Sequence, residues 1–110
     1  MTRKFILVGK DHLIAEVRDF LAWAEWMETA DRTVKVSTQD DVSVSTVFLG
    51  LDHNFSGKGP PILFETMVFV AGEGHDQRRY ATWEEAERGH DEMVRETFKP
   101  VVIERPHAES

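Results

Sequence analysis

A polar segment made of Asp52, His53, Asn54 and Phe55 carries the side chains whose types and order could do chemistry. An aspartate beside a histidine can orient the imidazole ring for acid–base work, and an asparagine amide can donate a hydrogen bond to a ligand. The same residue types also shape turns, because aspartate and asparagine side chains bond nearby backbone groups. Asp52, His53 and Asn54 are therefore candidate binding residues, with turn formation as the alternative.

Glu65 is the next candidate, because it stands alone among apolar residues. Met67 and Phe69 share its parity along a predicted strand, so its carboxylate faces the same side as their side chains. A carboxylate in such a place is paired with a cation, or protonated with a raised pKa, or located at an open edge of the sheet. Pairing with Arg78 or Arg79 would make Glu65 structural rather than functional.

His90 is the third candidate. The predicted last helix has one stripe of residues that faces the sheet: Trp83, Ala86, His90, Met93 and Thr97. A histidine on such a face is usually a hydrogen-bonded core residue. If His90 met Glu65 there, the two could instead form an acid–base pair.

Signatures of cofactor, metal and nucleophile sites are missing from the sequence. The five histidines are scattered, and no two of them have the i, i+4 spacing of a helical zinc site. The chain contains no GxGxxG fingerprint, no Walker loop, no GxSxG elbow and no cysteine. We therefore expect no cofactor and no metal, and we assign no catalytic residue.

Two apolar runs flank the polar segment and predict neighbouring strands. The first run changes parity between Val44 and Val47. We therefore expect a bulge near Ser45–Thr46, or burial of its second half on both faces. The second run, Ile62 to Ala71, is apolar on both parities. This is typical of a central strand covered on both faces, or covered partly by another subunit.

Short strands and two helices account for the rest of the chain. Strands are predicted at Phe5–Val8, His12–Val17 and Thr33–Thr38, with Val101–Glu104 as a candidate last edge strand. A first helix is predicted at about Arg18–Thr29, with an apolar stripe of Phe20, Trp23, Ala24 and Met27. A second helix begins at a capping box formed by Thr82 and Glu85 and ends near Thr97. The polar segment Gly72–Arg79 is predicted to be a loop.

The predicted order is β-β-α-β-β-β-α, with the optional last strand. Because hairpin connections dominate, we expect an α+β fold with a mainly antiparallel sheet of four to five strands and two helices packed on it. Residues 1–104 would form one domain, and residues 105–110 a flexible tail. Two short helices cover one face of a sheet, so the other face is expected to meet a second sheet or another chain, which favours a homodimer.

Composition narrows the classes of function. The formal net charge is −7 and basic residues do not cluster, which disfavours contacts with nucleic-acid phosphates. No apolar run approaches the roughly 20 residues of a membrane span, and the start of the chain lacks the features of a signal peptide. A chain without cysteine fits a reducing cytoplasm. We therefore expect a cytoplasmic protein that binds neither nucleic acid nor membranes.

Charge is uneven along the chain. Between Thr82 and Thr97, six acidic residues stand against two arginines. This pattern is typical of a solvated helix face. The alternative is an acidic surface that docks on a basic partner.

Three segments taken in order resemble a family of small uncharacterised proteins that are frequent in tailed-bacteriophage genomes and prophages: VSTVFLGLDHNF, PILFETMVF and RYATWEEAERGHDEMV. The resemblance covers roughly residues 42–94, about half of the chain. It implies a phage origin, expression in the bacterial host cytoplasm and an accessory or host-takeover role, and it carries no catalytic residue. The segment MVFVAGEGHDQRRY departs from the GG-containing tip of that family.

The sequence thus favours a small phage-type accessory protein that acts as a non-enzymatic binding module. Its partner would be a host protein or a small-molecule ligand, with host takeover or anti-defence as the role. The alternative is a small hydrolase or metal-dependent enzyme that uses Asp52, His53, Glu65 and His90.

Overall fold

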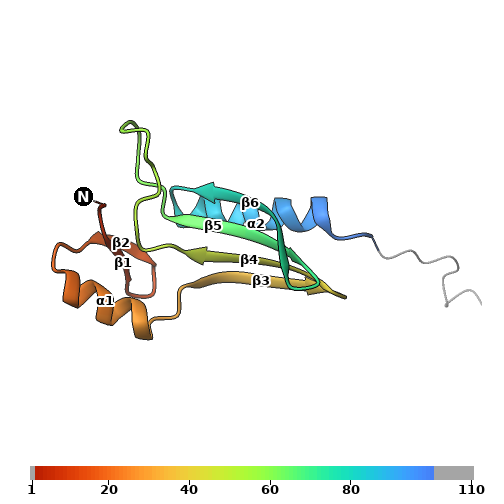
Figure 1. The fold of residues 1–110 in the computed structure, drawn as a ribbon, viewed down its shortest axis with the longest axis horizontal. Coiled ribbons are helices and arrows are strands. Elements are labelled where there is room, and N and C mark those ends of the chain that lie inside the picture. Colours follow the sequence, from red (N-terminus) through yellow and green to blue (C-terminus); the bar gives the residue numbers. More distant parts are fainter. Residues whose placement is uncertain (1, 101–110) are drawn as a thin grey trace, which may run out of the picture.

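The computed structural model of the 110-residue chain describes residues 2–100 and confirms an α+β fold (Figure 1). The elements follow one another as β1 (Phe5–Val8), β2 (Leu13–Glu16), α1 (Phe20–Thr29), β3 (Thr33–Gln39), β4 (Val42–Phe48), β5 (Phe64–Val70), β6 (Glu73–Tyr80) and α2 (Trp83–Thr97). β1 pairs with β2, and β3 to β6 form a four-stranded antiparallel sheet in sequence order. The strand predicted at 101–104 and the tail predicted at 105–110 lie outside the described residues.

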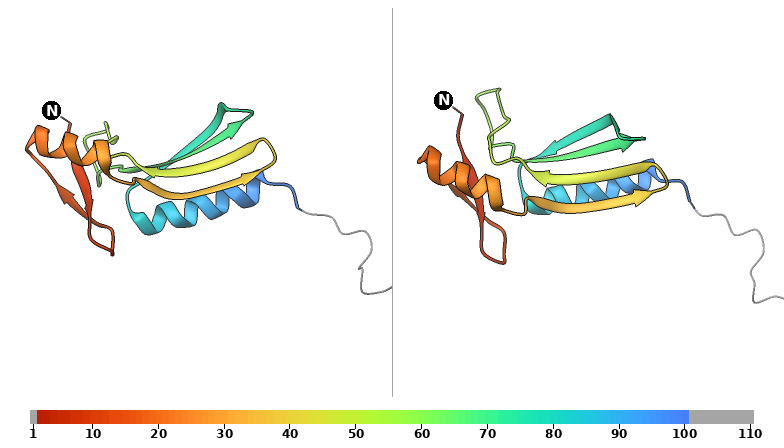
Figure 2. Two further views of the ribbon diagram at one scale, coloured as in Figure 1. Left: turned by 90° about the horizontal axis from the view of Figure 1, so that it is seen from below. Right: turned by 60° about the horizontal axis from the view of Figure 1, so that its bottom comes forward.

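The four-stranded sheet and α2 form two layers, and an N-terminal unit (β1, β2 and α1, residues 2–30) lies beyond one end of the sheet (Figure 2). α2 contacts every strand from β3 to β6, whereas α1 contacts β1. The opposite sheet face is called the open face here, because no helix or strand of residues 2–100 packs on it. Neither helix in this range is both long and apolar enough to cross a membrane.

β4 runs without a bulge. It pairs with β5 in one unbroken register from Val42 to Phe48, so the bulge predicted near Ser45–Thr46 is wrong. Val44, Thr46 and Phe48 alternate toward α2, and all three are fully buried. The apparent change of parity arises because a buried threonine occupies a position where an apolar residue was expected.

The irregularity lies in β3 instead. The pairing of β3 with β4 shifts between Thr33 and Lys35. After this shift Val36 faces the open side of the sheet and is 53% exposed, while Ser37 faces α2. A bulge in an edge strand re-aims the side chains that follow it, and here it delivers a hydroxyl to the interior.

The segment predicted as a polar loop, Gly72–Arg79, is mostly strand β6. Ala71 and Gly72 form the turn at φ 51° and 83°, and the chain then pairs back along β5. β6 is an edge strand with mainly exposed residues. The loop prediction is wrong because charged and polar residues are also what natural edge strands carry to prevent further pairing.

α1 presents a different stripe from the predicted one. Phe20, at the head of that stripe, is 61% exposed. Trp26, which lies off the stripe, packs edge-on against Phe48 with ring centroids 5.8 Å apart. The difference arises because α1 packs on β1 and on the end of the sheet rather than across its face.

Two buried clusters hold the sheet and α2 together. The first consists of Phe5, Phe48, Leu63, Phe64 and Ala86, and the second of Val44, Val68 and Met93. Trp83 lies edge-on to Phe64 at 6.0 Å between ring centroids and also stacks on His12 of the β1–β2 turn at 3.6 Å. The predicted capping box of Thr82 and Glu85 is present. The start of α2 is therefore tied both to the core and to the N-terminal unit.

Candidate functional site

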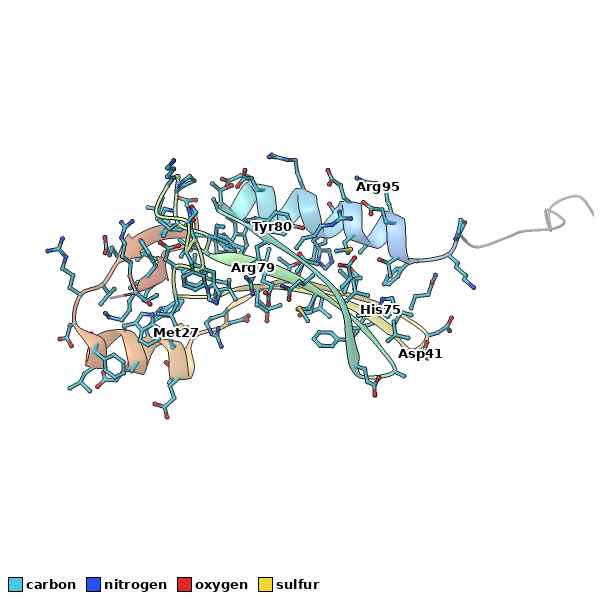
Figure 3. All side chains as sticks on the ribbon, turned by 45° about the horizontal axis from the view of Figure 1, so that its top comes forward. Met27, Asp41, His75, Arg79, Tyr80 and Arg95 are labelled. Carbon is cyan, nitrogen blue, oxygen red and sulfur yellow. The ribbon has the colours of Figure 1, made fainter. Side chains whose placement is uncertain are left out.

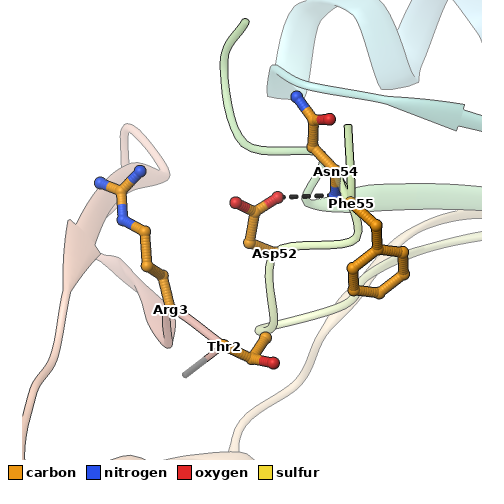
Figure 4. A pocket seen from close by; sticks show the side chains of 5 residues that line it. All are labelled: Thr2, Arg3, Asp52, Asn54 and Phe55. Atoms are coloured by element: carbon orange, nitrogen blue, oxygen red, sulfur yellow. Dashed lines mark hydrogen bonds between the residues drawn. The ribbon is translucent and has the colours of Figure 1, made fainter. Parts of the chain in front are cut away.

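Asp52 joins the two ends of the loop between β4 and β5. Its Oδ1 accepts hydrogen bonds from the backbone N–H of Asn54 at 2.8 Å and of Ile62 at 3.0 Å. The first of these bonds is drawn in Figure 4. Since Ile62 lies at the far end of the loop, this carboxylate holds the loop closed at its base. The arrangement is the turn chemistry that the sequence offered as an alternative.

Asn54 organises the projecting part of the same loop (Figure 1). Its Nδ2 donates to the carbonyl oxygens of Lys58 at 2.6 Å and Pro60 at 2.8 Å. Gly57 and Gly59 adopt φ 79° and 82°, a conformation that favours glycine. The asparagine side chain is therefore occupied by the backbone of its own loop.

His53 also bonds locally. Its Nδ1 lies 2.8 Å from the carbonyl oxygen of Leu51. A carbonyl only accepts, so Nδ1 carries the proton, and in the neutral ring Nε2 is left as an acceptor. The ring centroid of Phe55 lies 5.9 Å away. In residues 2–100 the ring of His53 is therefore oriented by the backbone of Leu51 and not by the carboxylate of Asp52.

A shallow hollow of about 310 Å³ lies between this loop and the start of the chain (Figure 4). It is lined by Thr2, Arg3, Asp52, Asn54 and Phe55. The guanidinium of Arg3 is engaged by both carboxylate oxygens of Glu16, at 3.0 and 3.1 Å. The lining includes the hydroxyl of Thr2 and no imidazole, and Oδ1 of its one carboxylate, Asp52, is engaged by the backbone N–H groups of Asn54 and Ile62.

Glu65 is paired with a cation on the neighbouring strand. Its carboxylate accepts a hydrogen bond from Nε of Arg79 at 2.8 Å, and its side chain is 15% exposed. Arg79 projects from β6 onto the open face, while the next residue, Tyr80, lies against α2 (Figure 3). The ion pair that the sequence offered as the structural interpretation of Glu65 is therefore present.

His90 lies between the sheet and α2 and is fully buried. Its Nδ1 is 2.8 Å from Oγ1 of Thr46, and its Nε2 is 2.9 Å from Oγ of Ser37. Oγ1 of Thr46 lies a further 2.5 Å from Oγ1 of Thr66. These four side chains form one polar chain through the core, in which both ring nitrogens are satisfied.

Burial lowers the pKa of His90, and the charge of Lys35 lowers it further. The imidazole is therefore neutral at pH 7, one of its nitrogens donating and the other accepting. Glu65 is on the opposite face of the sheet, because its neighbour Thr66 points to the side of α2, where its hydroxyl contacts that of Thr46. The proposed acid–base pair between Glu65 and His90 is not formed.

The five candidate residues thus occupy three separate places: a loop, the open face and the core. Sequence reasoning missed the hydroxyl groups around His90, although threonines at core-facing positions of β4 and β5 were a visible signal. It also missed a groove beside α1, whose signal was the number of large apolar residues in the first two dozen positions.

This N-terminal groove has a volume of about 410 Å³ and mainly apolar walls. It is lined by Thr2, Lys4, Arg18, Phe20, Trp23 and Leu51. The backbones of Lys4 and Leu51 form an antiparallel bridge at its floor. The indole Nε1 of Trp23 donates to the carbonyl oxygen of Gly50 at 3.1 Å, which fixes one wall.

Metal binding finds no support in this part of the chain. Within residues 2–100, no three histidine, aspartate or glutamate side chains converge as metal ligands. Comparison with known proteins finds no match to a family model, to a curated protein or to a solved structure.

Proposed function

We propose that the chain is a non-enzymatic binding module that engages a protein partner through its N-terminal unit. One observation carries this proposal. Seven large hydrophobic side chains are exposed in the described residues, and five of them belong to this unit: Val8, Leu13, Ile14, Phe20 and Leu21.

Exposure on this scale needs a physical reason. Leu21 is 70% exposed, and α1 has no fully buried residue. Monomeric proteins seldom concentrate uncovered apolar side chains in one part of the chain unless that part meets a partner. Val8 and Leu13 are direct cross-strand neighbours, so part of this apolar surface is continuous.

The remaining candidate chemistry is already used within the fold. Asp52 and Asn54 bond their own loop, and His90 is closed inside the core. The hydrolase alternative needs these groups to meet a substrate together, so we favour binding over catalysis. The resemblance to phage proteins makes a bacterial host protein the partner class of choice, with host takeover or anti-defence as the role.

Affinity capture from bacterial lysate with the full-length chain tests the proposal. We expect a partner, identified by mass spectrometry, that the Leu13→Ser/Leu21→Ser double variant no longer retains. Phe55→Ser is the matched control, because Phe55 is equally exposed but lies in the loop between β4 and β5. If the double variant keeps the partner, or if Phe55→Ser alone loses it, the N-terminal unit is not the binding surface.

A second copy of the chain is the alternative partner, and the open face favours it. Val36, Val47, Met67 and Phe69 lie on this face beside the ion pair of Glu65 and Arg79. The pair cancels its own charge, so two copies with a net charge of −7 can meet here without direct like-charge contact.

Light scattering tests this homodimer. We expect a concentration-dependent mass twice that of one chain, reduced to one chain by Val36→Glu and unchanged by Thr29→Glu on α1. A single-chain mass for the unaltered protein at every concentration would exclude the dimer.

A further inference from the structure

The N-terminal groove combines apolar walls with two cations that form no ion pair with a described carboxylate. Lys4 and Arg18 line it, and neither forms an ion pair within residues 2–100. Two acidic side chains close to them in sequence are already engaged. Glu16 is held by Arg3 at 3.0 Å, and Oδ1 of Asp19 caps α1 by accepting from the N–H groups of Leu21 and Ala22.

The charges of Lys4 and Arg18 reach the neighbouring carboxylate. The hydrogen bond from Arg3 lowers the pKa of Glu16, and the positive charges of Arg18 and Lys4 lower it further. The lining of the groove itself contains these two cations and no carboxylate. The charge of this lining is opposite in sign to that of the chain as a whole, so carboxylates of a ligand can pair with Lys4 and Arg18 here.

The shape of the site favours an extended ligand. A second hollow, of about 260 Å³, shares Thr2, Lys4 and Arg18 with the groove and continues it toward Val17. A compact molecule would fill one of these two depressions, whereas an extended peptide can lie along both.

The floor of the groove is held in place before any ligand binds. The backbone N–H of Phe5 donates to the carbonyl oxygen of Gly50 at 2.8 Å, and that of Asp52 donates to Arg3 at 3.0 Å. Phe20 and Trp23 form the aromatic wall, with ring centroids 5.9 Å apart. A preformed site loses less free energy on binding than one that must be ordered first.

We propose that the N-terminal groove binds an acidic peptide segment of the partner, with an apolar side chain against Phe20 and Trp23 and flanking carboxylates on Lys4 and Arg18. This inference rests on the proposed function and adds the chemistry of the docking segment. The acidic segment supplies the two features that the groove lacks: carboxylates for its cations and an apolar group for its walls.

The test is a titration of the full-length chain with a short blocked peptide that has a central Leu-Phe pair between glutamates. Binding is followed by the anisotropy of a dye on the peptide and by tryptophan fluorescence. We expect saturable binding that weakens with added salt and weakens at least about tenfold when glutamine replaces each glutamate, which corresponds to about 1.4 kcal/mol. Replacing the central pair by serine should also abolish binding.

Variants locate the site. Lys4→Gln/Arg18→Gln and Phe20→Ser should each weaken binding of the acidic peptide, and all three positions are at or near the surface. Lys10→Gln is the matched control, since Lys10 is an exposed cation in the β1–β2 turn outside the groove. Octanoate is the competitor that represents a small apolar anion.

Equal affinity for the glutamate and glutamine peptides, or unchanged binding by the Lys4→Gln/Arg18→Gln variant, would overturn the inference. Octanoate binding without peptide binding would overturn it as well, because the ligand would then be a small molecule. The proposed function fails separately, when lysate capture does not depend on Leu13 and Leu21. If capture of the partner depends on these leucines but not on Lys4 and Arg18, the proposed function is supported and only the acidic-peptide inference is contradicted.

Discussion

The N-terminal unit and the sheet with α2 differ in how far they bury their apolar side chains. In the unit of residues 2–30, Phe5 is the one buried residue, and several large apolar side chains face water. In the sheet and α2, alternate residues of β4 and β5 are fully buried, and the enclosed side chains of Thr46, Thr66 and His90 hydrogen-bond one another. The phenol oxygen of Tyr80 is the exception, since it is buried without a partner in residues 2–100. The sheet and α2 thus bury most of their large apolar side chains, whereas the N-terminal unit leaves five of them exposed.

The polar groups of the two regions differ in the same way. In the core, His90 and its hydroxyl partners consume each other's hydrogen-bonding capacity. At the N-terminal groove, Lys4 and Arg18 form no ion pair with the other residues of 2–100. A buried histidine whose two ring nitrogens are both hydrogen-bonded is a structural group. Surface cations beside apolar walls, in contrast, can form ion pairs that offset the free energy a charged ligand loses when it leaves water.

The largest expected effect uses two phenylalanines, one from each region. Phe48→Ala should lower the free energy of unfolding by about 3–5 kcal/mol, because Phe48 is fully buried between Trp26 and Phe64. Phe20→Ala should change it by less than about 0.5 kcal/mol, because Phe20 is mostly exposed. Urea denaturation of both variants measures the difference. Similar losses in the two would erase the contrast between the regions.

The sequence predicted those elements whose residues show a clear period or cap. The hairpin of β1 and β2, the capping box of α2 and the placement of His90 under the sheet all follow from local pattern. The orientation of α1 did not, because Trp26 faces the core only through contact with Phe48, a residue 22 positions away. Such pairings are set by tertiary packing, which a helical period does not contain.

The candidate site shows the same limit. The spacing of Asp52, His53 and Asn54 indicated either a site or a turn, and only the hydrogen bond that Asp52 accepts from the distant Ile62 shows which role the carboxylate has. β6 was missed because its polar composition is shared by loops and edge strands. The large apolar residues of the first two dozen positions indicated an apolar surface, but not the lining of the N-terminal groove, since Lys4, Arg18 and Leu51 come together only through the fold.

The next effect concerns the polar chain in the core. Thr46→Val keeps the shape of the side chain but removes the hydroxyl that contacts both His90 and Thr66. We expect a loss of about 1–3 kcal/mol, because buried partners are left without a hydrogen bond. Thr38→Val on the open face is the control, with little expected change. Thermal and urea denaturation measure both variants. An equal loss of stability in Thr46→Val and Thr38→Val would show that the polar chain is dispensable.

At pH values above those at which carboxylates titrate, we expect the pH dependence of stability to come from His90. Its pKa is lowered in the folded chain from the ordinary 6.5 by burial and by Lys35 of β3, against a smaller raising effect of Asp91 on α2. The unfolded chain then binds the proton more readily, so stability is full above pH 6.5 and falls as the pH drops below it. The slope for one proton is at most about 1.4 kcal/mol per pH unit.

Urea titrations between pH 5 and pH 8 measure this slope, and His90→Gln should flatten it. The lowered pKa values of Glu16, Asp91 and Glu96 act in a lower window, below their ordinary values of 4.5, 3.8 and 4.5. A slope that survives His90→Gln would mean that another group titrates in this range.

The smallest effect is expected at Glu65, and it separates the open face from the core on the other side of the same strand. Glu65→Ala removes an ion pair with Arg79, whose side chain is 38% exposed. Half-exposed pairs of this kind contribute about 0–1 kcal/mol, because water still solvates the cation that remains. Thr66, the next residue, is fully buried, so Thr66→Val should cost more than Glu65→Ala although it removes no charge. Denaturation curves for the two variants show whether buried hydrogen bonds or surface charge contribute more to the stability of β5. A larger loss of unfolding free energy for Glu65→Ala would show that Arg79 is desolvated when the pair is broken.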